Sequence, residues 1–343
     1  LLQCLGEISV CKTIHHILQT IARRMNFVAI HPKSEGKRIV EIDYLKSVFI
    51  LLMIAFHLAY FADSYPYLKQ FVYTFHMSGF LIISGYLMKV GKTVRQYGRT
   101  ILWLAVPYVI METGYVGMAS ILPIKDHVEN LTLQVFLNKL LVNPLGPYWY
   151  LHTLILCGVL YFVTFRWIKT TNFSRLIVLG LLYYAMSLSG LVALNCSLYF
   201  WLGIAVRQCG YSLLHVFRKS WWSVVVLVIL FFHPETFDKA SPGGMLIVYF
   251  IFSFLLTIFP FVPGTAKKIL ACLGRNSLVL YIFSPVFTLC CKVFIPYLGF
   301  DSTHIVYLVI SLPLCVSGCI LLCKILDLLH ISPFLFGRRQ VLI

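Results

Sequence analysis

Three side chains that can carry charge lie on one face of an apolar segment near the start of the chain. The segment EIDYLKSVFILLMIAFH, residues 41–57, has Asp43 and Lys46 at one end and His57 at the other. In an α-helix, the step from Lys46 to His57 returns to within about 20° of the same face and spans about 16 Å, and Asp43 lies within about 40° of His57. Imidazole exchanges protons near neutral pH, so this face pairs a cation with a group suited to proton transfer. The structural alternative is a histidine that hydrogen-bonds a neighbouring carbonyl or hydroxyl group.

Residues 75–99 combine a histidine, spaced small residues and a basic run. His76 lies near the start of this segment. The small residues, which allow a second helix to approach closely, are Ser78, Gly79, Ser84 and Gly85. The basic residues are Lys89, Lys92, Arg95 and Arg99. Such a run ordinarily anchors a helix at the cytoplasmic face, but together with Lys46 it could bind the phosphates of a cytosolic ligand through charge-assisted hydrogen bonds.

Three further residues stand out in later apolar segments. Glu112 lies five residues after Pro107, which should disturb the helix. A carboxylate at that depth in a membrane needs a partner. Trp149 and His152 lie at the start of another apolar segment, on the side opposite Lys46. Aromatic residues at such positions usually belong to the membrane interface.

Long apolar stretches predict an all-α, polytopic membrane protein. Of the 343 residues, 60% are hydrophobic and 12% are charged, whereas about a quarter of a soluble domain is charged. Apolar runs of about 20 residues are long enough to cross a bilayer. We predict a bundle of about ten transmembrane helices, of which the sixth and seventh are short. Their ranges are 44–62, 71–88, 101–121, 148–165, 176–194, 197–206, 221–233, 245–262, 276–291 and 304–326.

Lys and Arg residues are divided unequally between the two sides of this bundle. With the N-terminus in the cytoplasm, 21 of the 28 lie in cytoplasmic segments, five lie on the opposite side, and Lys46 and Lys324 lie within or at the edge of spans. This is a strong positive-inside signal and predicts that both termini are cytoplasmic. The net charge of +16 therefore reflects topology, and we predict no nucleic-acid partner.

One membrane domain accounts for most of the chain. We divide it into a basic cytoplasmic segment at residues 1–37, the membrane domain at residues 38–330 and a short cytoplasmic tail at residues 331–343. The first residue is Leu, and Met25 precedes a more ordinary start for a membrane protein. Residues 1–24 are therefore either an artefact of start-site choice or a basic amphipathic helix on the cytoplasmic leaflet.

The 11 cysteines contain no C-x-x-C pair and no ligand spacing with histidine, so we predict no metal site. Cys315, Cys319 and Cys323 recur every four residues. This stripe resembles a zinc or redox site only in its spacing, because small polarizable residues at this interval also suit helix packing.

Five sequence blocks occur in an order that identifies a known family. They are the pattern E-I-D-Y-L-K-x10-H ending at His57, the block FHMSGFLIISGYL (75–87), Arg95 and Arg99 followed by Pro107 and Tyr108, the element PYWYL (147–151) and the element LGRNSLVLYIF (273–283). With these blocks, the chain resembles the membrane acyltransferase family 3, polytopic bacterial enzymes that acylate cell-surface glycans and related acceptors. The resemblance covers about residues 38–330.

The resemblance implies that His57 is the catalytic histidine. The family usually has arginine where this chain has Lys46, and lysine keeps the charge but lacks the bidentate fork. Arg95 and Arg99 match the family's cytoplasmic arginines, although those usually lie closer together and closer to the proline. Ser284 and Pro285 occupy a region where many relatives have a histidine.

The resemblance also implies the substrates. The donor is acyl-CoA, with acetyl-CoA as the first candidate, and no cofactor is permanently bound. The acceptor is a hydroxyl group of a glycan or a lipid-linked saccharide, and membrane lipids are the other partners. The implied location is the bacterial inner membrane. The predicted substrate-binding residues are Lys46, Asp43, Arg95, Arg99, His76, Glu112, Trp149 and His152.

Two alternatives remain open in the sequence. His57 is either a general base for the acceptor hydroxyl or a carrier that forms a transient acyl-imidazole. For the whole protein, the alternative function is a transporter or flippase of a lipid-linked saccharide. That class favours internal repeats with helices broken at matching positions, and we find no such repeat. A non-catalytic scaffold leaves His57, Lys46 and Glu112 unexplained, and a channel lacks a filter motif.

Overall fold

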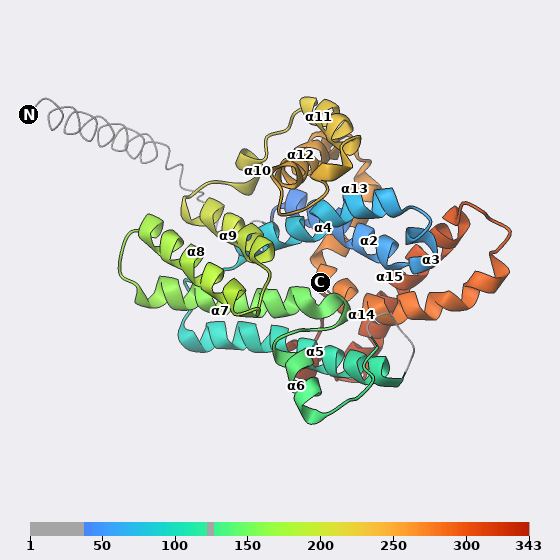
Figure 1. The fold of residues 1–343 in the computed structure, drawn as a ribbon, viewed down its shortest axis with the longest axis horizontal. Helices are drawn as coiled ribbons and strands as arrows, with labels where there is room; N and C mark the ends of the chain where they lie inside the picture. Colours follow the sequence, from blue (N-terminus) through green and yellow to red (C-terminus); the bar gives the residue numbers. More distant parts are fainter. Residues whose placement is uncertain (1–37, 122–126, 343) are drawn as a thin grey trace, which may run out of the picture.

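The computed structural model describes residues 38–121 and 127–342. These residues fold into α-helices and short 3₁₀ helices, with no strand among them (Figure 1). The predicted all-α class is confirmed for this part of the chain. The predicted N-terminal segment, residues 1–37, lies outside the described residues.

The helices follow one another with short connections. The α-helices are α2 (Val40–His57), α3 (Ala59–Ala62), α4 (Pro66–Leu87), α5 (Val94–Ile121), α6 (Leu133–Leu141), α7 (Trp149–Trp167), α8 (Asn172–Leu188), α9 (Leu194–Gln208), α10 (Leu213–Val216), α11 (Trp222–Phe231), α12 (Pro242–Ile258), α13 (Gly264–Arg275), α14 (Ser277–Cys290), α15 (Ile305–Leu328) and α16 (Ser332–Phe336). The 3₁₀ helices are η1 (Gly146–Tyr148), η2 (Pro234–Thr236), η3 (Phe259–Phe261) and η4 (Cys291–Tyr297).

Five helical stretches are long and apolar enough to cross a membrane, which makes this a multi-pass membrane protein. They are Val94–Ile121, Gly146–Trp167, Pro242–Phe261, Ser277–Tyr297 and Ile305–Leu328. Helices α8 and α11 are apolar but shorter. Each of the ten predicted ranges covers most of a different α-helix, namely α2, α4, α5, α7, α8, α9, α11, α12, α14 and α15, and the first range also includes α3. The number of ten spans stays a prediction.

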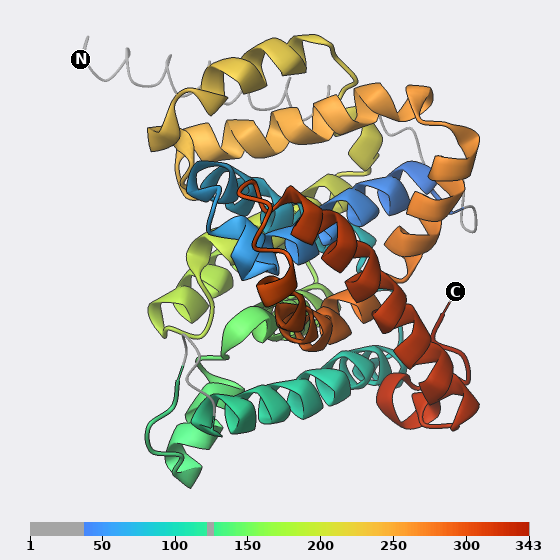
Figure 2. The same ribbon diagram turned by 90° about the vertical axis from the view of Figure 1, so that its right-hand side faces the viewer.

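Helices α2 and α4 form the centre of the bundle. Helices α9 and α12 pack against α4, and α13 and α14 pack against α2. Figure 2 shows α11 and α12 on one side of this centre and α5 on the opposite side. The ring of Phe49 on α2 is fully buried against Phe80 of α4 and Phe252 of α12, with ring centroids 6.0 and 5.3 Å away. Apolar packing around α2 therefore fixes the helix that carries Lys46 and His57.

Two glycines let α4 and α9 cross in close contact. A Cβ atom on Gly85 would lie 2.1 Å from the carbonyl oxygen of Phe200, and one on Gly203 would lie 2.0 Å from the carbonyl oxygen of Ile82. Because the opposing atoms are backbone, no side-chain rotation could make room. The expectation that small residues after His76 allow close helix approach is confirmed at Gly85.

Gly85→Ala is therefore expected to destabilise the protein by about 1–3 kcal/mol or more, the usual cost of overpacking. Gly98→Ala on α5 is the matched control, because a Cβ atom there meets no atom of the described residues within 4 Å. Thermal unfolding of the detergent-solubilised variants measures both effects. Equal transition temperatures for the two variants would contradict the close α4–α9 crossing.

Pro107 does not end the helix that contains it. Helix α5 continues from Val94 to Ile121 with Pro107 inside it. Membrane helices tolerate an internal proline when neighbouring groups satisfy the backbone. The disturbance expected at Pro107 therefore does not interrupt the helix, although proline lacks the N–H donor of the regular pattern.

Candidate functional site

Helix α2 contributes one polar side chain to each of two separate cavities. Lys46 lines a cavity of about 330 Å³ that also contains Lys89 and Lys92, and we call it the basic cavity. His57 lines a cavity of about 630 Å³ that also contains His76, and we call it the histidine cavity. Lys46 and His57, which we predicted on one face of the helix, therefore line two different cavities at successive positions along α2.

The end of α2 places His57 in the histidine cavity. His57 is the last residue of α2, and the chain resumes as α3 at Ala59. The Nδ1 atom of His57 lies 2.7 Å from the carbonyl oxygen of Met53. Because a carbonyl oxygen only accepts hydrogen bonds, Nδ1 carries the proton. The lone pair is then on Nε2, the nitrogen that can accept a proton from a substrate.

His76 repeats this arrangement on α4. Its Nδ1 lies 2.7 Å from the carbonyl oxygen of Val72, and its Nε2 is buried with no hydrogen-bond partner among the described residues. His76 is 3% exposed, so it reaches the cavity only at its edge. The ring of Tyr73 lies beside both histidines, with centroids 6.2 Å from His57 and 5.2 Å from His76. The structure thus brings the two predicted histidines together.

The remaining wall of the histidine cavity carries charged groups. Lys69 forms an ion pair of 2.7 Å with Asp63. Lys239 lies over the ring of Trp149, with its Nζ 5.3 Å from the ring centroid. All four residues line the cavity. Trp149, predicted as a substrate-binding residue, is therefore at this site, whereas Lys69 and Lys239 were not among the predicted residues.

An ion-pair chain at the start of α2 holds Lys46. Its Nζ lies 3.1 Å from Oδ1 of Asp43, and the other carboxylate oxygen of Asp43 lies 2.6 Å from Nε of Arg38. Asp43 is 5% exposed and does not line the basic cavity. Asp43 therefore positions Lys46. The three groups together carry one net positive charge.

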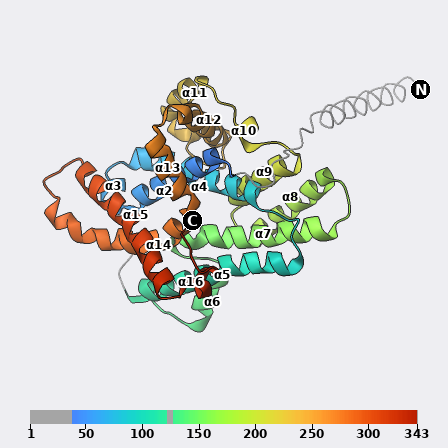
Figure 3. The same cartoon turned by 180° about the vertical axis from the view of Figure 1, so that it is seen from behind.

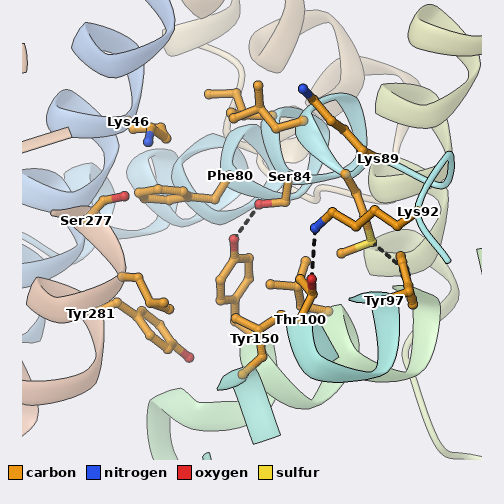
Figure 4. Close-up of a pocket in the computed structure, with 16 residues that line it drawn as sticks. Lys46, Phe80, Ser84, Lys89, Lys92, Tyr97, Thr100, Tyr150, Ser277 and Tyr281 are labelled. Carbon is orange, nitrogen blue, oxygen red and sulfur yellow. Dashed lines mark hydrogen bonds between the residues drawn. The ribbon is translucent and has the colours of Figure 1, made fainter. Parts of the chain in front are cut away.

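The basic cavity lies between α2, α4, α5, α7 and α14 (Figure 4). Figure 4 shows Lys46 on one side of the cavity and Lys89 and Lys92 on the other. Lys92 donates a hydrogen bond of 2.8 Å to Oγ1 of Thr100. Cations thus face the cavity from two directions.

Helices α4 and α7 contribute side chains to both cavities. Phe80 and Tyr150 line the basic cavity. Met77, about one turn before Phe80 on α4, and Trp149, the residue before Tyr150, line the histidine cavity. The Phe80 and Tyr150 rings contact each other with centroids 6.0 Å apart. The Tyr150 hydroxyl lies 2.7 Å from Oγ of Ser84. These two rings therefore lie on the same two helices that line the histidine cavity.

Four other predicted residues lie away from the two cavities. Glu112 is fully buried, and its Oε1 accepts a hydrogen bond of 2.6 Å from the backbone nitrogen of Leu145. His152 lies with its Nε2 2.9 Å from the carbonyl oxygen of Leu141. Both residues therefore secure the connection between α6 and α7. Arg99 lines a third cavity, and Arg95 is exposed one turn earlier on α5.

The cysteine stripe of α15 is part of the packing. Cys315, Cys319 and Cys323 are fully buried, and α15 packs against α14. The Sγ atom of Cys315 lies 3.6 Å from that of Cys291. No three His, Cys, Asp or Glu side chains among the described residues come together as a metal site.

Comparison with known proteins gives one match. The family model described as an acyltransferase domain, of the acyltransferase 3 type, matches residues 39–324 of the chain. These residues include α2 with both of its cavities. No curated protein and no solved structure matches the chain.

Proposed function

The chain belongs to the acyltransferase 3 family, and from this premise we propose that it moves an acyl group from cytosolic acyl-CoA to a hydroxyl group across the membrane. Acetyl is the first candidate for the acyl group, and a glycan or lipid-linked saccharide is the acceptor. One observation carries the proposal: α2 has a cation in one cavity and, in the next, a histidine whose Nδ1 is hydrogen-bonded to the Met53 carbonyl oxygen, so that its lone pair is on Nε2.

The positive-inside rule orients the bundle. We propose ten spans, formed by the long helices α5, α7, α12, α14 and α15 together with α2, α4, α8, α9 and α11. Lys89, Lys92 and Arg99 are then cytoplasmic, and so is the basic cavity. The histidine cavity opens to the other side of what we propose to be the bacterial inner membrane.

The basic cavity suits the arm of the donor. Acyl-CoA has a charged nucleotide end and a long thin arm that ends in a thioester. Lys46, Lys89 and Lys92 would attract phosphate groups, and the apolar wall between them would contact the arm. The thioester would reach His57 after displacement of the Phe80 and Tyr150 side chains. This displacement accompanies donor binding in our proposal.

The histidine cavity suits the transfer step. A hydroxyl group of the acceptor gives its proton to Nε2 of His57 while its oxygen attacks the thioester carbonyl carbon. The carbon–sulfur bond breaks, and the leaving thiolate takes the proton back from the imidazolium. Lys239, Asp63 and Gln70 line the cavity and can hydrogen-bond the other polar groups of a saccharide. An acyl-imidazole on the same Nε2 is the two-step version.

The proposed reaction predicts that purified protein in lipid vesicles transfers label from acetyl-CoA to a lipid-linked saccharide. It also predicts that the protein binds CoA without any acceptor, because the basic cavity is separate from the histidine cavity. Equilibrium binding of radiolabelled CoA and chromatography of the extracted saccharide measure the two results. Movement of unmodified saccharide across the vesicle without use of acetyl-CoA would support the flippase alternative and contradict the proposal.

A further inference from the structure

A third cavity extends the basic cavity towards the C-terminal segment. It has a volume of about 720 Å³, and we call it the C-terminal cavity. It shares Lys92, Thr100, Leu104 and Leu278 with the basic cavity. The two cavities are therefore neighbours with common walls.

Cations from different parts of the chain line the C-terminal cavity. Lys92 precedes α5, Arg99 lies on α5, and Arg338 follows α16. No acidic residue lines the cavity within the described part of the chain. None of the three cations is in an ion pair with another described residue. The cavity therefore favours an anionic ligand.

The C-terminal segment is fixed against the bundle. Asp327 at the end of α15 accepts hydrogen bonds from Oγ of Ser332, at 2.5 Å, and from the backbone nitrogen of Val341, at 3.1 Å. These contacts bracket residues 332–341, and Figure 3 shows α16 beside α5. The position of Arg338 is thus set by the fold.

Gly337 brings this segment against α5. Its φ angle is +65°, and a Cβ atom would lie 2.1 Å from the Trp103 ring. Phe336, the preceding residue, is 6% exposed. Only glycine allows both this backbone angle and this contact. The turn that follows α16 therefore directs the chain at Arg338 along the edge of the cavity.

We propose that Arg338, together with Arg99, binds phosphate groups at the nucleotide end of acyl-CoA. The proposal rests on the proposed function and extends it beyond residue 324, where the family match ends. Arginine suits this role because its guanidinium group binds phosphate oxygens in pairs. The volume is within the range of small-molecule sites. The arm of the donor then lies in the basic cavity, and the nucleotide lies in the C-terminal cavity.

Arg338→Gln tests the proposal, and Arg339→Gln is the matched control. Both changes remove one positive charge from neighbouring exposed residues, but Arg339 does not line the cavity. We expect Arg338→Gln to weaken CoA binding about tenfold, equivalent to about 1.4 kcal/mol. We expect Arg339→Gln to bind CoA like the unchanged protein.

Truncated donors separate a phosphate contact from a general defect. Acetyl-pantetheine lacks the nucleotide, so we expect Arg338→Gln to leave its KM unchanged while raising the KM of acetyl-CoA. Equal CoA affinity in Arg338→Gln and unchanged protein would overturn the proposal, as would an equal rise in KM for both donors. Unchanged protein that binds CoA but transfers no acyl group would contradict only the proposed function, because the binding comparison still decides the role of Arg338. Absence of CoA binding in unchanged protein would overturn both.

Discussion

His57→Ala is expected to lower kcat for acyl transfer by at least about a hundredfold. General acid–base catalysis by a positioned side chain accelerates a reaction by about 10²–10⁴-fold. If His57 instead carries the acyl group, the change to alanine removes the nucleophile itself, and the covalent route is lost. His57 faces the histidine cavity with Nδ1 committed to the Met53 carbonyl oxygen. Its Nε2 is therefore the basic nitrogen available to a substrate. Transfer of label from acetyl-CoA, measured with saturating donor and acceptor, tests this expectation.

CoA binding is the control for this variant. His57 is outside the basic and C-terminal cavities, so His57→Ala should bind CoA like the unchanged protein. If His57→Ala binds CoA normally but no longer transfers the acyl group, the defect lies in the chemical step and not in donor binding. Incubation of the unchanged protein with labelled acetyl-CoA and no acceptor separates the two mechanisms, because only a carrier accumulates label on His57. Full transfer activity in His57→Ala would refute both roles.

The sequence predicted the helix that carries the site more completely than the walls around it. Helical periodicity alone relates Lys46 to His57, because both lie on one α-helix. It does not reveal that Phe80 and Tyr150 line the cavity beside Lys46, since those rings come from α4 and α7. The same limit applies to Asp43. It shares the polar face in sequence, but its ion pairs with Arg38 and Lys46 keep it out of the cavity.

Contacts between distant segments explain the other differences from the predicted site. The expectation of a partner for Glu112 is met at Oε1 by the backbone N–H of Leu145, a group that every residue type except proline carries and that leaves no mark in a sequence. Arg338 became a candidate only once the fold placed the C-terminal segment beside Arg99. Helix α5 begins at Val94, so only Arg95 and Arg99 of the four cations in the basic run lie on it. Lys89 and Lys92 therefore lie in a connection whose direction helical periodicity cannot predict.

Lys46→Ala is expected to raise the KM for acyl-CoA at least tenfold. A hydrogen bond to a charged group contributes about 1.5–3 kcal/mol, and each 1.4 kcal/mol corresponds to about a factor of ten. Lys46 lines the basic cavity with its side chain 15% exposed. Its charge is therefore partly withdrawn from water, and little screening weakens its attraction for a phosphate group. Initial rates at varied acyl-CoA concentration, with saturating acceptor, measure the effect.

The shared carboxylate of Asp43 makes this variant interpretable. Removal of one partner usually destabilises a buried ion pair because the other charge is left alone. Here Arg38 remains 2.6 Å from Asp43 after Lys46 is removed, so the carboxylate keeps a partner and the protein should still fold.

Arg38→Gln is the matched control, since it removes one charge from the same chain of ion pairs but from a residue that does not line the basic cavity. Lys46→Arg, which restores the residue usual in the family, should keep the KM near that of the unchanged protein. If Arg38→Gln raised the KM as much as Lys46→Ala, the effect would come from the ion-pair chain, and direct contact of Lys46 with the donor would be ruled out.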